Sequence, residues 1–396
     1  MKKKIFTLLA LFACVLSASA DNKVTVTSNV IASGGTIYVE LENTDEIGGF
    51  QVTLNLPDGL SYVKATTGSR LVQGKAEEGA HYCAFTNSGQ SITAACFGGV
   101  KDGKMTTLIG NSGALFAIEV SVTDASKLTG GSFSGELTTS AGSAVPVPNT
   151  SFDVVIADRY VIDENSTITP MLADGVNVTV KRSIKKDVWN TIVLPFNLTQ
   201  TKAKAVFGDN LKVVEFDGFT TAYSDEEDVT PDAIKINFKT FSWTKTGMVA
   251  GTPYLIKTDK DDFDEFNIDA VKITVSEVSA VSKSDNEGTK GVFTGSLVKT
   301  SIPEDALFIS DNKFWYSKGV TNTKGLRGWF ELGAVLGKAT DFGAPVFIVI
   351  DGETTKVEEV RGIFEDGAFY NLNGMKVENP TKKGVYIQNG KKIVVK

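Results

Sequence analysis

Short runs of alternating apolar and polar residues, each bounded by turn residues, recur along this chain and constrain its fold more than any other feature. In the first third they cover residues 23–28, 36–42, 47–56, 60–65, 80–87, 91–97, 114–123 and 151–156. Glycine-rich turns such as Gly34-Gly35, Pro57-Asp58-Gly59 and Asp102-Gly103 separate them. Many short strands at this spacing are typical of a sandwich. We therefore expect an all-β protein that begins with a β-sandwich.

The first twenty residues have the pattern of a secretory signal peptide. Three lysines at 2–4 precede an apolar stretch at 5–16, and Ala18-Ser19-Ala20 offers a small-residue cleavage site. An alternative is a lipoprotein signal ending at Cys14, although Phe12 is bulky for that motif. No later stretch approaches the ~20 apolar residues of a membrane-spanning helix. These patterns predict an exported protein, extracellular or at the outer-membrane surface, without a transmembrane span.

Charge and length narrow the class further. Three of the 40 Lys and Arg residues lie in the predicted signal, which leaves 37 basic against 47 acidic residues, a formal charge of −10. Such an excess of acidic residues excludes nucleic acid as an expected partner. The chain is longer than a domain with a single hydrophobic core usually is, so more than one domain is expected. We predict domains at 21–157 and 158–351 and a small β-module at 352–396.

The two cysteines of the mature chain lie on adjacent predicted strands. If the turn at 88–91 closes a hairpin that pairs Asn87 with Ile92, the same register pairs Cys83 with Cys96. Facing cysteines in an oxidising compartment form a disulfide, worth about 3 kcal/mol for a loop of this size. The alternative is a pair of buried free thiols.

Two segments of the first domain resemble the cohesin family: GFQVTLNLPDGL at 49–60 and GNSGALFAIEV at 110–120. Cohesins are jelly-roll sandwiches that bind calcium-loaded dockerin modules, and they are related to carbohydrate-binding sandwiches. The matching residues are core and turn positions, with Phe50, Val52, Leu54 and Leu56 alternating toward one face. The resemblance implies a sandwich that binds a protein partner, of dockerin type or another, or a glycan.

The remaining segments resemble parts of exported Bacteroidota proteins. Motifs such as WNTIVLPFNL at 189–198 and AGTPYLIK at 250–257 are similar to a β-rich domain of unassigned function in surface proteins of Bacteroides and Prevotella. The Asn-Gly turns and alternating runs after 367 resemble C-terminal segments associated with sorting or surface attachment. Trp189 and Phe196 are expected in the core of a second sandwich-like domain, and 199–207 is expected to be its one short helix.

Catalytic and metal patterns are sparse. His81 is the only histidine, and no nucleophile elbow accompanies it. The acidic runs 225–228 and 259–265 are candidate calcium ligands, but the EF-hand template fails at Phe263 and Asp264. Two carboxylates suffice for glycoside hydrolysis, which leaves an unrecognised hydrolase as an alternative. We expect a non-enzyme without a required cofactor.

Aromatic residues supply the candidate ligand chemistry. Trp315, Tyr316 and Trp329 flank the glycine-rich loop 319–328 and could stack on sugar rings, or pack in the core instead. The sequence thus favours an exported surface protein whose first domain binds glycans or proteins, with a link to polysaccharide use. A structural or adhesive surface component is the alternative.

Overall fold

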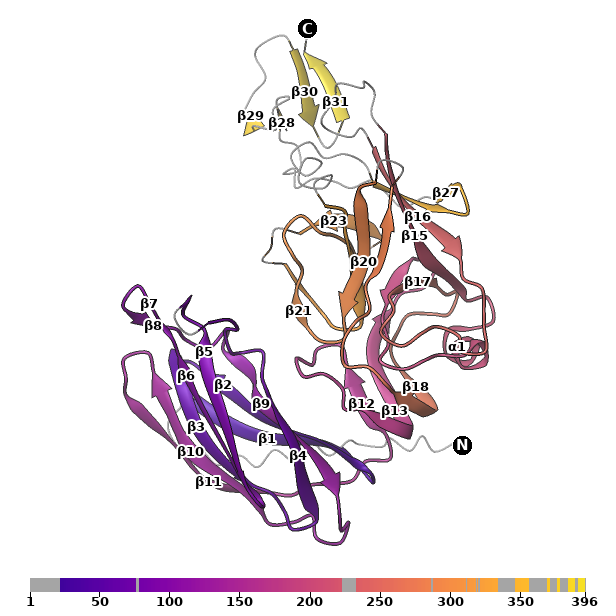
Figure 1. Ribbon diagram of the computed structural model, residues 1–396. Helices are drawn as coiled ribbons and strands as arrows, with labels where there is room; N and C mark the ends of the chain where they lie inside the picture. Colours follow the sequence, from indigo (N-terminus) through magenta and orange to yellow (C-terminus); the bar gives the residue numbers. More distant parts are fainter. Residues whose placement is uncertain are drawn as a thin grey trace, which may run out of the picture. The chain divides into compact units, whose positions relative to one another are not determined.

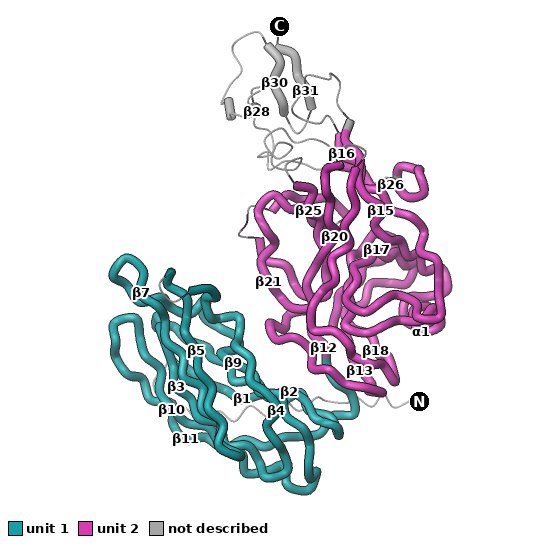
Figure 2. Tube along the Cα trace, viewed as in Figure 1, with its two compact units in different colours: residues 1–161 teal, residues 162–396 magenta. Residues whose placement is uncertain are grey.

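The computed structural model describes residues 22–75, 78–222, 233–285, 288–310, 312–317, 319, 321–333 and 346–355, and the strands at 369–370, 376–377, 384–388 and 391–395. The predicted signal peptide and the acidic run 225–228 lie outside the described residues. The chain divides into two compact units, residues 1–161 and 162–396 (Figure 2). Both consist of strands, with one helix in the described part, so the all-β prediction is confirmed. That helix is too short to cross a membrane.

Unit 1 is a sandwich of two antiparallel sheets (Figure 1). One sheet has four strands in the order β1 (Asn22–Ile31), β2 (Gly34–Asn43), β9 (Ser112–Val122) and β4 (Leu60–Thr67). The other has five strands in the order β11 (Ala144–Phe152), β10 (Gly131–Thr139), β3 (Ile47–Asn55), β6 (Ser91–Gly98) and β5 (His81–Ser88). A small hairpin, β7 (Val100–Lys101) and β8 (Lys104–Met105), follows β6.

The alternating pattern of the strands builds the core of unit 1. Phe50, Val52 and Leu54 of β3 are fully buried, and Ile92, Ala94 and Cys96 of β6 lie beside them in the register of the pair. Phe50 stacks against Phe116 of β9 with ring centroids 6.0 Å apart, which joins the two sheets. Every second side chain of these strands therefore packs between the two sheets, while the side chains in between face solvent.

Strand β10 did not follow from the sequence pattern. It pairs with β3 along its length and contributes Phe133 and Leu137 to the core. The strand is rich in Ser, Thr and Gly, and a bulge at Ser134 interrupts its pairing with β11. Two apolar residues in nine are too few for an alternating pattern to be recognised in the sequence. Strand β10 is therefore evident only from its pairing with β3.

Unit 2 contains several sheets. A three-stranded sheet has the order β12 (Tyr160–Asp163), β13 (Ala173–Ile184) and β18 (Phe263–Ile273). A six-stranded sheet has the order β14 (Asn190–Ile192), β17 (Tyr254–Lys257), β15 (Lys212–Ala222), β16 (Ala233–Thr240), β26 (Val346–Ile350) and β27 (Glu353–Thr355). A five-stranded sheet has the order β19 (Val281–Ser284), β20 (Lys290–Ser296), β25 (Arg327–Glu331), β22 (Leu307–Ser310) and β23 (Lys313–Tyr316). Strands β21 (Thr300–Ser301) and β24 (Asn322–Thr323) pair by themselves. The last sheet has the order β29 (Lys376–Val377), β28 (Phe369–Tyr370), β30 (Gly384–Gln388) and β31 (Lys391–Val395).

The core of unit 2 lies between its six-stranded and five-stranded sheets. Phe216 and Phe238 come from the first sheet, and Phe293 and Phe330 come from the second. The last two rings stack with centroids 4.4 Å apart. Trp189 is part of this cluster, and Phe196 is also buried, so the predicted core positions are confirmed.

Helix α1 (Gln200–Phe207) matches the predicted helix. The side chain of Thr199 caps its first turn by accepting the backbone N–H of Lys202. At the other end, Phe207 is buried against Phe266 of β18, with centroids 5.2 Å apart. The cap and this apolar contact account for a stable helix of only eight residues.

Candidate functional site

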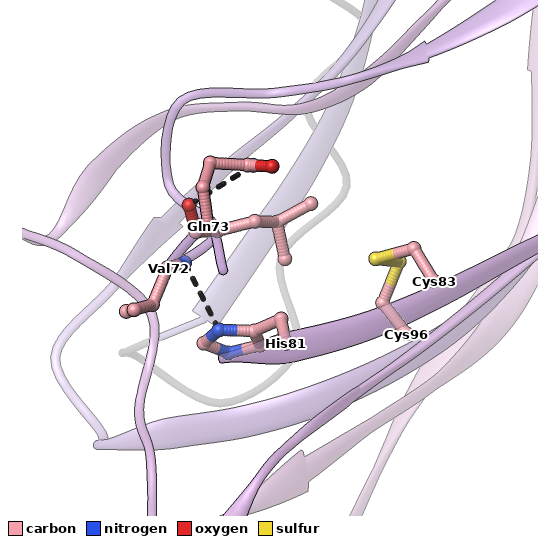
Figure 3. The surroundings of a disulfide bond; sticks show 6 residues. Val72, Gln73, His81, Cys83 and Cys96 are labelled. Carbon is pink, nitrogen blue, oxygen red and sulfur yellow. Dashed lines mark hydrogen bonds between the residues drawn. A yellow bond between two sulfur atoms is a disulfide. The ribbon is translucent and has the colours of Figure 1, made fainter. Parts of the chain in front are cut away.

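The β5–β6 hairpin combines a covalent link with exposed aromatic rings. Its register pairs Asn87 with Ile92 and Cys83 with Cys96, as the turn predicts. A disulfide joins the two cysteines, whose Cα atoms are 4.1 Å apart (Figure 3). This short separation is typical of a non-hydrogen-bonded pair in an antiparallel ladder. The link holds edge strand β5 on the sheet.

His81 occupies the start of β5 and bonds to the segment before it. Its backbone N–H donates to the carbonyl of Val72 at 2.9 Å, and its Nδ1 accepts the Val72 N–H at 3.0 Å (Figure 3). Nε2 is buried and has no partner among the described residues. Burial lowers the pKa of the imidazole. His81 thus holds backbone, and among the described residues it has no carboxylate partner of the kind that a catalytic triad needs.

In the β5–β6 hairpin, the residue pair next to the two cysteines carries two large rings that face solvent. Tyr82 of β5 lies opposite Phe97 of β6, and the two residues are 66% and 49% exposed. Gly49 of β3 is the next residue in this row, and a Cβ there would lie 3.4 Å from the Phe97 ring. The ring therefore rests across a strand that has no side chain at this point.

The rest of this outer face is small and mostly uncharged. Behind the aromatic pair, the outward residues of the three strands are Ala84 and Thr86 on β5, Thr93 and Ala95 on β6, and Gln51 and Thr53 on β3. Thr53 and Thr93 share a hydrogen bond of 2.8 Å. The surface is thus flat except for one protruding aromatic pair. We name the Tyr82–Phe97 pair and these six residues the hairpin face. The sequence could have indicated Tyr82 and Phe97, because the register that pairs the cysteines also pairs them.

The aromatic candidates of the second domain are divided between two sides of its five-stranded sheet. Trp315, Phe308 and Trp329 form one cross-strand row. Trp329 is 7% exposed and packs with Ile302, Ala306 and Phe308. Its indole N–H donates to Glu331 at 2.8 Å. The prediction that Trp329 stacks on a sugar is therefore wrong, because its faces are covered by protein.

Tyr316 points to the opposite side and packs against the core of unit 2. Burial also raises the pKa of its hydroxyl. Trp315 is half-buried on edge strand β23, and its indole N–H donates to the carbonyl of Ser310. Trp315 and Tyr316 are thus both half-buried, whereas Trp329 is buried.

The acidic segment 259–265 lines a groove of about 810 Å³ between the end of α1 and β18. Its carboxylates are bound to separate partners: Asp261 to Lys186 at 3.0 Å, Asp262 to Lys185 at 2.9 Å, and Asp259 to Asn210 at 2.7 Å. Over the described ranges, no group of three or more acidic, histidine or cysteine side chains converges in a way that could hold a metal ion. Two of the five carboxylates of this segment are thus paired with lysines, and the hypothesis of a calcium site at 259–265 finds no support among the described residues.

No protein-family model matches the chain. No curated protein matches it either.

Solved structures similar to part of the chain include two cohesins. A non-cellulosomal cohesin from the archaeon Archaeoglobus fulgidus aligns over 34% of this chain and 92% of its own, with 21% identity and a TM-score of 0.26. The sixth cohesin of scaffoldin B from Acetivibrio cellulolyticus, solved in complex with a dockerin, covers 34% and 99% with 13% identity and a TM-score of 0.26. The chitin-binding domain of a Pyrococcus furiosus chitinase covers 33% and 98% with 13% identity and a TM-score of 0.20. Because these TM-scores are low, the description of the fold rests on the strands and sheets of this chain and not on the alignments.

Proposed function

We propose that unit 1 is a non-catalytic binding module that docks a protein partner on the hairpin face. The observation that carries this proposal is the directly paired, solvent-exposed Tyr82 and Phe97. Aromatic rings bury a large area at small cost in side-chain entropy, and they dominate the energetics of many interfaces. A protein without a partner gains nothing from exposing two such rings side by side.

Rigidity of the hairpin supports the same function. The Cys83–Cys96 disulfide lies one residue from the aromatic pair on each strand. Because the strands are covalently joined there, the backbone that carries the two rings loses little further conformational freedom on binding, and preorganisation of this kind increases affinity. The small side chains of the rest of the face allow a flat partner surface to approach closely.

The class of partner and the location are further parts of the proposal. The cohesin resemblance of residues 49–60 and 110–120 supports an extracellular protein partner, of which a dockerin-type module is one form. The signal pattern of residues 1–20 and the disulfide both fit export, since disulfides persist in oxidising compartments. The C-terminal module, predicted at 352–396, would then attach or sort the protein at the cell surface.

A glycan is the second candidate ligand. Exposed rings such as Tyr82 and Phe97 can stack on the apolar faces of sugars, and the partly exposed Trp315 offers a separate ring in unit 2. A glycan ligand would connect the protein to polysaccharide use. A flat face that binds neither ligand would instead suit a structural or adhesive surface component.

The test compares two faces of unit 1 in the full chain. A photoreactive phenylalanine analogue replaces Tyr82 in one variant and Val63 in another, because Val63 is 50% exposed on β4 of the other sheet. After crosslinking in the producing cells, the partner captured at position 82 is purified. Its Kd is then measured for the wild type, Tyr82→Ala, Phe97→Ala and Val63→Ala.

We expect each aromatic substitution to weaken binding by about 30-fold, the effect of a hot-spot residue worth about 2 kcal/mol. Val63→Ala should stay within about twofold of the wild type. Equal losses for Val63→Ala and Tyr82→Ala, or no specific capture at position 82, would overturn the protein-docking proposal. Binding on a glycan array that Tyr82→Ala abolishes would select the second candidate.

A further inference from the structure

Four charged side chains converge in unit 2. The carboxylate of Glu164, after β12, accepts from Arg327 at 2.8 Å and from Lys324 at 2.9 Å. The guanidinium of Arg182 on β13 lies 3.5 Å from the same carboxylate. Glu164 and Arg182 are buried, whereas the side chains of Lys324 and Arg327 are 49% and 27% exposed. We name these four residues the Glu164 cluster.

The charges of the Glu164 cluster do not balance. One carboxylate faces three cations, so the four side chains carry a formal excess of two positive charges. Charges that are partly removed from water are costly unless they are neutralised. The imbalance is local, because the chain as a whole is acidic, with a formal charge of −7.

The buried member of the cluster has its donors occupied. Arg182 donates to the backbone carbonyls of Leu326, Ser183 and Thr191. The outer member does not, because Nε of Arg327 is buried and has no acceptor among the described residues. The unused donor of Arg327 is thus buried, while on the solvent side the 49% exposed ammonium of Lys324 has one carboxylate contact for its three N–H donors.

Backbone geometry fixes the two exposed cations in place. Leu326, fully buried between them in the sequence, adopts a φ of +60°, which is uncommon for a bulky residue. The N–H of Gly325 donates to the carbonyl of Glu164 at 2.6 Å, so the turn is held to the carboxylate-bearing segment. A strained conformation that the surrounding contacts maintain is a feature of ligand sites.

We propose that Lys324 and Arg327 bind a single oxyanion, a sulfate or carboxylate group, on the solvent side of the Glu164 cluster. The flat guanidinium of Arg327 and the ammonium of Lys324 provide charge-assisted donors from two directions. The ligand would neutralise one of the two excess charges. This site lies in unit 2 and is independent of the hairpin face.

Repulsion inside the cluster supports the proposal. The pKa of Arg182 is lowered to about 9, first by burial and then by the charge of Arg327, and the charge of Glu164 only partly opposes this. The one carboxylate therefore does not offset both guanidinium groups. An anion beside Arg327 would reduce the repulsion and so stabilise the folded unit.

The test measures sulfate binding to the full chain by calorimetric titration, with sodium chloride at matched ionic strength as the reference. Galacturonic acid oligomers form a second arm, which separates a sugar-borne carboxylate from a free inorganic ion. The variant is Lys324→Gln, because the buried Glu164 still pairs with Arg327 and Arg182 when this half-exposed side chain is changed. The control is Lys272→Gln, whose ammonium pairs with Asp174 on an exposed surface of the same unit.

We expect saturable binding in the wild type, about tenfold weaker binding in Lys324→Gln, and unchanged binding in Lys272→Gln. Arg327→Lys, which keeps the charge but removes the planar fork, should also weaken binding. A non-saturating response that is the same in all variants would show only the general effect of sulfate on protein surfaces and would overturn the proposal. Substituting Tyr82 should leave this binding unchanged, so the two proposals can fail separately.

Discussion

His81 shows how a residue with catalytic chemistry can serve structure instead. Its Nδ1 accepts the Val72 N–H and its Nε2 is buried, so the neutral imidazole is the form that fits the site. An imidazolium cannot accept that hydrogen bond, because both ring nitrogens would carry protons. The folded protein therefore disfavours protonation, in agreement with the lowered pKa.

This predicts a pH dependence of the stability of unit 1. In the unfolded chain the pKa of a histidine is about 6.5, so the unfolded state binds the proton more tightly than the folded state. The contribution of neutral His81 is complete above about pH 6.5 and is lost as the pH falls toward the lower folded pKa. Urea unfolding between pH 5.5 and 7.5 should show this loss in the wild type and a flatter profile in His81→Gln. Parallel profiles would contradict it.

Glu164 is the residue on which the charge balance of unit 2 depends. Burial alone would raise its pKa, but the charge of Arg327, the hydrogen bond from Lys324 and the charge of Arg182 hold the pKa below its usual range. Its ionised form therefore stabilises the folded state above the unfolded pKa of about 4.3, and this contribution is lost as the pH falls through the folded pKa.

Glu164→Gln should lower the free energy of unfolding of unit 2 by about 3 kcal/mol, because it leaves the buried Arg182 without a counter-charge. Glu265→Gln is the matched control, since Glu265 is an exposed carboxylate on β18 of the same unit. Denaturant unfolding at pH 7 measures both. Equal small effects would mean that the backbone carbonyls around Arg182 satisfy its charge without Glu164.

At the scale of elements, the β5–β6 hairpin is the unit on which the proposed binding depends. Strand β5 lies at the edge of its sheet and contacts β6 alone within it. An edge strand has half the ladder hydrogen bonds of a central one, so it separates more easily. The disulfide across a loop with a sequence separation of 13 opposes this separation.

Reduction should therefore destabilise unit 1 by about 3 kcal/mol in the chain-entropy account of such a loop. Unfolding is measured with and without dithiothreitol, which changes the covalent link but no side-chain atom except the two thiol hydrogens. The Cys83→Ala/Cys96→Ala variant is the control and should not respond to reductant. A wild type that is equally insensitive would show that the cysteines are not bonded in the purified protein.

At the scale of the whole chain, the position at which unit 1 ends determines how stable an isolated fragment of that unit is. The sequence predicts that the first domain ends at 157, and the first two residues of β12 beyond this point, Tyr160 and Val161, contact strands of unit 1. Tyr160 is buried, with its hydroxyl 3.5 Å from that of Thr36. The side chain of Asn29 bonds to both the N–H and the carbonyl of Val161, at 3.0 and 2.7 Å.

A fragment of residues 22–161 should consequently be more stable than one of 22–157 by about 2 kcal/mol, the value of one buried large side chain. Thermal unfolding of both fragments tests this, and Tyr160→Ala in the longer fragment should account for most of the difference. If the two fragments melt together, the contacts of 160–161 add no stability and the boundary predicted from sequence suffices.

Local patterns were enough for much of the fold. The strands around Phe50 and Ile92 follow from alternation with period two, and the cysteine register follows from a four-residue turn. Helix α1 follows from its cap at Thr199 and the apolar residues at 203, 206 and 207. Each of these signals lies within about ten residues, where turn geometry and side-chain periodicity act directly.

Properties that depend on distant residues were decided only by the tertiary structure. Strand β10 is defined by its pairing with β3, because its own residues are too polar to show alternation. Trp329 is buried by Ile302 and Ala306 across the sheet, and Glu164 meets Lys324 across 160 positions of sequence. The sequence by itself determined the strands whose own residues alternate between apolar and polar, since that pattern depends on neighbouring residues. Which faces are covered and which charges meet depends on long-range packing, and these determine where this protein can bind.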